Sequence, residues 1–241
     1  MWRMNKSSPI ILACDTEEIS SVIQFIEQTS QYVGVYKLGL EFFLAKGAQG
    51  VSEIQNQFPG VRIFLDLKLH DIPNTVGAAT AQVAALKPKF LTVHASGGSA
   101  MINAAATNAP DTDITAVTIL TSLSQEDLKE IGYEGTPQSR AVEMAKLAVA
   151  SGARAIVCSP LEIEGIRAVV PASISIITPG IRPKGSAGSD DQKRVMDPKS
   201  AIAAGANYLV IGNAYLGDFY FGLMTQSIFV KFINCLFKGK I

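Results

Sequence analysis

Ionisable side chains interrupt one short apolar stretch of this sequence. The run Phe64-Leu65-Asp66-Leu67-Lys68-Leu69-His70-Asp71 alternates leucine with residues that can carry charge. In a β-strand this alternation places Asp66 and Lys68 on one face and the leucines on the other. A carboxylate this close would keep the lysine protonated and fix its position. Such an ammonium group could stabilise a developing negative charge and then donate a proton, whereas the simpler interpretation is a structural ion pair.

Other polar residues stand at the ends of other apolar runs. They are Asp15, Lys37, His94, Thr121, Ser122, Ser159 and Thr178. Asp71 falls just beyond the expected strand that carries Asp66. An ionised group at the end of an apolar strand needs a partner or a function. His70 and His94 are the only histidines, and they lack the spacing of metal ligands. We therefore expect an acid–base site and no metal centre.

A second group of residues has the chemistry of an anion site. It comprises Thr178-Pro179-Gly180-Ile181-Arg182, then Gln192, then Val210-Ile211-Gly212. Glycine lets backbone N–H groups approach an anion, and an arginine adds a charge-assisted fork of donors. The stretch 178–191 is rich in Gly, Pro and Ser, which predicts a mobile loop beside the site. An ordinary surface loop is the alternative.

Composition limits the classes of protein that this chain can be. Of its 241 residues 48% are hydrophobic and only 17% are charged, which excludes a disordered chain. Twenty-one basic residues balance twenty-one acidic ones, so a nucleic-acid-binding protein is not expected. No apolar run approaches the roughly 20 residues of a membrane span. Three cysteines without metal-binding spacing indicate reduced thiols and a cytoplasmic location.

The elements that carry these residues repeat with a regular rhythm. Apolar, β-branched runs alternate with amphipathic stretches, and Thr16 is expected to cap the first helix. The predicted strands are Ile10–Cys14, Val33–Gly39, Val61–Leu67, Phe90–His94, Ile114–Leu120, Ala155–Cys158, Ile174–Thr178 and Tyr208–Ile211. Eight such units without a linker predict a single-domain (β/α)₈ TIM barrel over residues 1–241, with the active site at the carboxyl ends of the strands. A doubly wound open sheet is the alternative, although no GxGxxG follows the first strand.

The run from Phe64 to Asp71 continues as Ile72-Pro73-Asn74-Thr75-Val76, and the whole segment resembles the signature of the bacterial, monofunctional orotidine 5′-phosphate decarboxylase family. Further similarity extends from Ile11 to Gly212. It includes Lys37-Leu38-Gly39-Leu40-Glu41, Thr92-Val93-His94-Ala95-Ser96-Gly97-Gly98, Leu120-Thr121-Ser122, Val157-Cys158-Ser159 and Thr178-Pro179-Gly180-Ile181-Arg182. The order of these motifs makes the resemblance far more specific than DxKxxD alone.

The resemblance implies a function and a set of site residues. It implies a cofactor-free lyase that converts orotidine 5′-phosphate to UMP and CO₂ in pyrimidine biosynthesis, with Lys68 as proton donor between Asp66 and Asp71. It further implies a homodimer in which Asp71 and Thr75 reach the partner's site, and it counts Ile72 among the substrate-binding residues. Asp15 and Lys37 would contact the ribose, and Thr121 and Ser122 the base. Pro179, Arg182, Gln192 and Gly212 would hold the phosphate. Repulsion between Asp66 and the substrate carboxylate is a further contribution that the sequence leaves open.

Two other functions remain open at this stage. A related barrel enzyme acting on a sugar phosphate shares DxKxxD but uses Mg²⁺, and a degenerate barrel could bind a nucleotide without converting it. The C-terminal end of the chain keeps the nucleotide-binding alternative open, because Asn213 stands where the family has a phosphate-binding arginine. Asparagine lacks the guanidinium charge and fork, so weaker phosphate binding is expected. Residues 214–241 are atypical and hold seven of the chain's 18 aromatic residues, through either divergence or an altered reading frame.

Overall fold

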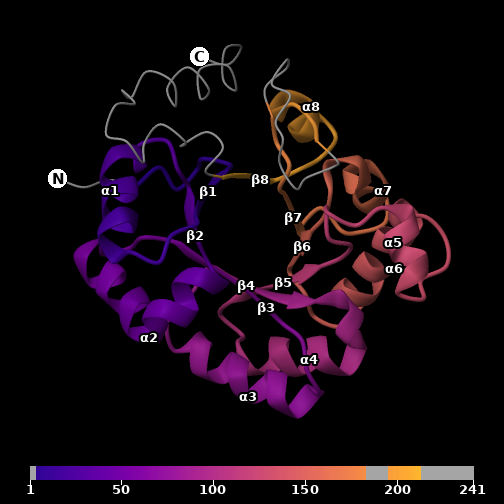
Figure 1. Cartoon of the computed structure of the whole chain (residues 1–241), viewed down its shortest axis with the longest axis horizontal. Helices are drawn as coiled ribbons and strands as arrows, with labels where there is room; N and C mark the ends of the chain where they lie inside the picture. Colours follow the sequence, from indigo (N-terminus) through magenta and orange to yellow (C-terminus); the bar gives the residue numbers. More distant parts are fainter. Residues whose placement is uncertain (1–3, 183–194, 213–241) are drawn as a thin grey trace.

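Eight parallel strands form a closed barrel in which neighbours follow the chain order and β8 pairs with β1 (Figure 1). The structure, a computed structural model, describes residues 4–182 and 195–212. The strands are β1 (Ile10–Cys14), β2 (Val35–Gly39), β3 (Ile63–Leu69), β4 (Phe90–His94), β5 (Asp113–Val117), β6 (Ala155–Val157), β7 (Ser175–Thr178) and β8 (Tyr208–Ile211). Closure in sequential order confirms the TIM barrel and contradicts the open doubly wound sheet.

Helices surround the barrel and cover the outward faces of its strands (Figure 1). The α-helices are α1 (Ile19–Thr29), α2 (Leu40–Gln57), α3 (Pro73–Ala84), α4 (Gly98–Asn108), α5 (Gln125–Glu130), α6 (Pro137–Ala150), α7 (Ile163–Arg167) and α8 (Pro198–Ala203). Two short 3₁₀ helices, η1 (Ala95–Gly97) and η2 (Pro160–Glu162), precede α4 and α7. Because strands and helices alternate, each βα connection delivers its residues to the same end of the barrel.

Two local expectations need correction. Thr16 does not cap α1: its hydroxyl accepts a hydrogen bond from the Glu18 amide at 3.1 Å, and Glu18 itself is the cap residue. The threonine therefore closes a turn before the helix begins. The sequence reading also missed α5, whose six residues are too few to show a helical period, although Ser124 and Asp127 form a capping box.

Apolar side chains fill the barrel below its carboxyl-end rim. One buried cluster lies inside the barrel and contains Ile11, Val35, Phe64, Phe90, Ala155 and Ile177. The Phe64 and Phe90 rings meet edge to face at 5.6 Å between centroids, and Phe90 meets Tyr208 at 5.3 Å. A larger cluster between barrel and helices includes Leu65 and Leu67, on the face opposite Asp66. The packed interior leaves the carboxyl end of the barrel as the place for a cavity.

The described part of the chain contains no helix that is both long enough and apolar enough to cross a membrane. Cys14 and Cys158 are buried, and neither forms a disulfide bond.

Candidate active site

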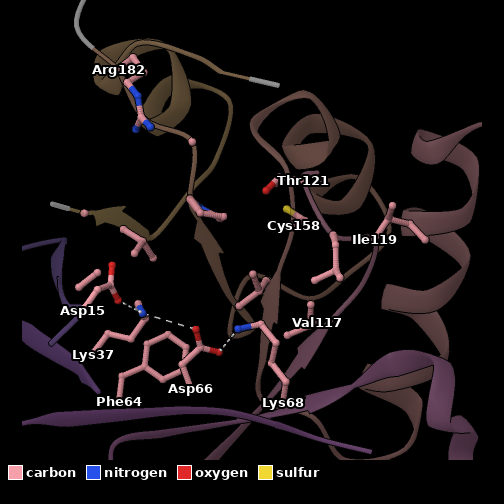
Figure 2. Close-up of a pocket in the computed structure, with 17 residues that line it drawn as sticks. Asp15, Lys37, Phe64, Asp66, Lys68, Val117, Ile119, Thr121, Cys158 and Arg182 are labelled. Atoms are coloured by element: carbon pink, nitrogen blue, oxygen red, sulfur yellow. Dashed lines mark hydrogen bonds and ion pairs between the residues drawn. The ribbon is translucent and has the colours of Figure 1, made fainter. Parts of the chain in front are cut away.

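A cavity of about 410 Å³ opens at the carboxyl ends of the strands. Such a volume suits a small-molecule ligand. Figure 2 shows side chains from opposite sides of the barrel converging on it. The lining residues are Ala13, Asp15, Lys37, Phe64, Asp66, Lys68, Val117, Ile119, Leu120, Thr121, Val157, Cys158, Pro179, Gly180, Arg182, Val210 and Gly212.

Alternating charges from three adjacent strands form one end of the cavity (Figure 2). Lys68 Nζ lies 2.8 Å from Asp66 Oδ1, and Lys37 Nζ lies 3.7 Å from Asp66 Oδ2. Lys37 also donates a hydrogen bond to Asp15 Oδ1 at 3.1 Å. The register between β2 and β3 pairs Lys37 with Phe64 and brings the two strand ends together. Each oxygen of Asp66 therefore faces a different ammonium group.

Mutual attraction keeps this cluster ionised. Burial by itself would raise the pKa of Asp66, but Lys37, Lys68 and hydrogen bonds from Lys68 and Thr92 lower it below its usual value. Burial would likewise lower the pKa of Lys37, yet Asp66 and Asp15 offset this and raise it. At neutral pH Asp66 is thus a carboxylate and Lys37 an ammonium.

Apolar side chains also line the cavity, among them Phe64, Val117 and Val157. The end of the cavity away from the lysines carries an arginine (Figure 2). At the far end Arg182 follows Gly180, whose φ of +73° is readily adopted only by glycine (Figure 2). The Arg182 amide donates to the Met196 carbonyl at 2.9 Å, which ties the chain together on both sides of residues 183–194. The cavity therefore has a lysine–carboxylate end and an arginine end, with apolar side chains in its lining.

Eight of the predicted site residues line this cavity, and four others do not. The eight are Asp15, Lys37, Asp66, Lys68, Thr121, Pro179, Arg182 and Gly212. Asp71, Ile72, Thr75 and Ser122 are exposed and lie outside the lining of their own chain's cavity. Asp71 accepts a hydrogen bond from the Ile72 amide at 2.6 Å. Gln192, Asn213 and the atypical segment 214–241 lie outside the described residues, as does most of the predicted loop 178–191.

Sequence reasoning overlooked Thr92 as part of the site. This fully buried residue on β4 donates a hydrogen bond from Oγ1 to Asp66 Oδ1 at 3.0 Å. Its signal in the sequence is a hydroxyl inside an otherwise apolar strand, which by itself names no partner. Cys14 is near the charged end, but burial raises the pKa of its thiol to about 12, so it remains protonated and a poor nucleophile.

The two histidines lie together beside the site. Their ring centroids are 5.3 Å apart. Burial, His70 and Lys68 lower the pKa of His94, and Asp66 only partly opposes this. Within residues 4–182 and 195–212, no three His, Cys, Asp or Glu side chains cluster as metal ligands would.

The closed barrel, with a lysine–carboxylate cluster at its polar mouth, has the architecture of a (β/α)₈-barrel enzyme. The chain belongs to the orotidine 5′-phosphate decarboxylase / HUMPS family, whose model matches residues 8–217.

Individual relatives agree with this assignment. The chain is 45% identical over 209 residues to orotidine 5′-phosphate decarboxylase of Thermobifida fusca, with 86% of this chain and 88% of that protein covered. It is 46% identical over 208 residues to the enzyme of the same name from Sphingopyxis alaskensis, covering 86% and 91%. The crystal structure of orotidine 5′-phosphate decarboxylase from Lactobacillus acidophilus superposes with a TM-score of 0.78 at 29% identity, covering 95% and 99%.

Proposed function

We propose that this protein decarboxylates orotidine 5′-phosphate to UMP and CO₂ in pyrimidine biosynthesis, without a metal or organic cofactor. The observation that carries the proposal is Lys68 Nζ held 2.8 Å from Asp66 at the charged end of the cavity. The relatives that bear the name of this activity are similar to the chain over most of its length. Residues for each part of the substrate are available around one cavity.

Lys68 is the proton donor in this mechanism. Breaking the bond between C6 and the carboxylate releases CO₂ and leaves an electron pair on C6. A fixed ammonium beside C6 stabilises that charge as it forms and then transfers its proton to C6, which gives UMP. Lys68 afterwards regains a proton from water. Asp66 holds the ammonium in place before the reaction starts, and Lys37 pairs with the other oxygen of Asp66, so little reorganisation is needed during the reaction.

Other residues would bind the remaining parts of the substrate. Asp15 and Lys37 contact the ribose, and Thr121 contacts the base together with its neighbour Ser122, which lies outside the cavity lining. Pro179, Gly180, Arg182 and Gly212 surround the phosphate, together with Gln192 and, more weakly, Asn213. Loops after the seventh and eighth strands often bind phosphate in this fold. Binding energy from the phosphate would then help to position C6 against Lys68.

The proposal includes a homodimer with shared active sites. Asp71, Ile72 and Thr75 are exposed directly after β3, and Ile72, although apolar, is 66% exposed. These positions suit an interface through which Asp71 reaches the partner's cavity. We also propose a cytoplasmic location, which two buried cysteines outside any disulfide bond support.

A direct assay of UMP formation tests the catalytic proposal. We expect purified protein to convert orotidine 5′-phosphate and Lys68→Ala to lose at least about 10³-fold in kcat, because charge stabilisation and proton donation are both removed. Lys89→Ala is the matched control. Lys89 pairs with Asp113 near the start of β4, away from the cavity lining, so kcat should be close to that of the unmodified protein.

The same assay separates this proposal from the alternatives. Activity should be unchanged after EDTA treatment, whereas a Mg²⁺-dependent sugar-phosphate enzyme would show metal-dependent turnover of that substrate class. Near-normal UMP formation by folded Lys68→Ala would contradict the assigned role. Binding of UMP without turnover by the unmodified protein would instead favour a nucleotide-binding barrel.

A further inference from the structure

The backbone of β3 is irregular at the lysine itself. Leu65 pairs with Leu91 on β4, but the next pair joins Leu69 to Val93. Between these two pairs, three residues of β3, Asp66 to Lys68, lie opposite a single residue of β4. Lys68 lies within this bulge with a φ of +49°, a left-handed conformation that is unfavourable for a residue with a Cβ atom. The bulge directs Lys68 toward the cavity that Asp66 also lines.

One buried hydroxyl on β4 joins both parts of this arrangement. Thr92 lies between the two paired residues, Leu91 and Val93, and is fully buried. Its Oγ1 accepts a hydrogen bond from the Lys68 amide at 2.8 Å and donates one to Asp66 Oδ1 at 3.0 Å. Lys68 Nζ donates to the same carboxylate oxygen at 2.8 Å. A threonine hydroxyl has one proton and two lone pairs, so it can serve both neighbours at once.

We propose that Thr92 is a positioning residue for Lys68: its hydroxyl holds the bulged backbone of the lysine and the carboxylate that orients the lysine's ammonium group. The inference rests on the proposed role of Lys68 as proton donor. Thr92 does not line the cavity, so it acts through Lys68 and Asp66 and does not touch the substrate.

The physical reason is that a strained backbone persists only where its surroundings hold it. In a bulge the amide of the extra residue loses its partner on the neighbouring strand, and here the Thr92 hydroxyl supplies that partner. Lys68 also has a long, flexible side chain whose ammonium must stay within reach of C6. Displacing a reacting group by about 1 Å can cost roughly 100-fold in rate. Anchoring the lysine at its amide and at its counter-ion limits such displacement.

Thr92→Val tests this role, because valine keeps the shape of threonine but removes the hydroxyl. We expect kcat for orotidine 5′-phosphate to fall about 10- to 100-fold while KM and inhibition by UMP change little. Thr92→Ser keeps the hydroxyl and should retain kcat within about threefold. Thr115→Val is the matched control: Thr115 is a fully buried strand residue whose hydroxyl donates only to the Asp113 carbonyl. Its kcat should stay near that of the unmodified protein.

Several outcomes would overturn the inference. One is a folded Thr92→Val protein with unchanged kcat, and another is a Thr92→Ser protein as impaired as Thr92→Val. If Thr92→Val does not fold, Thr92→Cys replaces it, since a thiol is a weak donor and acceptor. A cysteine variant as active as the serine variant would then refute the role. Lys68→Ala is measured in parallel: if it remains active, the proposed function of Lys68 fails, whereas an inactive Lys68→Ala beside a normal Thr92→Val refutes the positioning role alone.

Discussion

At the scale of single residues, Asp66 is the centre of the site. Its two oxygens face Lys68 and Lys37, and Thr92 adds a neutral donor. Lys37 and Lys68 outweigh the effect of burial and keep the pKa of Asp66 below its ordinary value. A carboxylate that is better stabilised in the folded protein than in the unfolded chain contributes stability only while it is ionised.

This linkage predicts how Asp66 affects stability at different pH values. The contribution of Asp66 should be present above its unfolded pKa, near 3.9, and should disappear as the pH falls through its lower folded pKa. When the pH is lowered from 6 to about 2, the unmodified protein should therefore lose unfolding free energy relative to Asp66→Asn. Urea denaturation at several pH values measures this difference.

An exposed carboxylate provides the baseline for that experiment. Asp111 is exposed and lies outside the cavity lining, so Asp111→Asn shows what the loss of one surface charge does across the same pH range. A difference for Asp66→Asn that stays constant with pH, or that follows the Asp111→Asn curve, would contradict the coupling of Asp66 to the two lysines.

At the scale of elements, the start of β2 depends on a close approach of the chain to itself. Gly34 precedes β2 and is buried against the segment before β1. A Cβ atom at Gly34 would lie 2.2 Å from the Ser8 carbonyl oxygen. Arg62 strengthens the contact by donating from Nε to the Gly34 carbonyl at 2.9 Å and from Nη2 to the Lys6 carbonyl. This contact fixes the start of the strand that delivers Lys37 to the opposite end of the barrel.

We therefore expect Gly34→Ala to destabilise the protein. The added methyl group meets a backbone atom that cannot rotate away, and overpacking of this kind costs about 1–3 kcal/mol. Gly39→Ala is the comparison, because its Cβ would meet only Lys37 Nζ at 3.6 Å, an ordinary contact distance. Urea denaturation should show a clearly smaller loss of unfolding free energy for Gly39→Ala. Equal losses for the two variants would mean that the approach to Ser8 is not what excludes a side chain.

At the scale of the whole molecule, the proposed dimer makes each active site a product of two chains. Lys68→Ala and Asp71→Ala should each be inactive alone. In a mixed dimer one site combines the intact Lys68 of one chain with the intact Asp71 of the other. After subunit exchange at equal concentrations, about half of the dimers are mixed and each has one intact site, so roughly a quarter of the original activity should return.

A second mixture shows whether the rescue depends on sharing between subunits. Asp66 and Lys68 pair within one chain, so mixing Lys68→Ala with Asp66→Asn creates no intact site and should restore no activity. Subunit exchange is verified with differently tagged chains. An inactive Lys68→Ala and Asp71→Ala mixture in which exchange is demonstrated would contradict the shared site.

The sequence alone determined the fold class and the shared face of Asp66 and Lys68 in the candidate site. Apolar runs alternating with amphipathic stretches predicted a parallel sheet, because strands buried on both faces and connected by helices are parallel, and the count of eight units favoured its closure into a barrel. Asp66 and Lys68 were assigned to one face from the two-residue period, and both line the cavity. Strand ends were less exact: β3 continues to Leu69 and β5 ends at Val117, since the apolar pattern does not mark where pairing stops.

Only the tertiary structure decided how Lys68 is held. Its left-handed backbone arises from the shifted register between β3 and β4, and its amide partner, Thr92, lies 24 residues away along the chain. Local sequence carries no information on which hydroxyl a distant strand will bring beside a carboxylate. The apolar part of the cavity lining was likewise set by closure of the barrel, which turns Phe64, Val117 and Val157 toward one space. Residue types and their period can be read along the chain, whereas register and hydrogen-bond partners exist only after strands have paired.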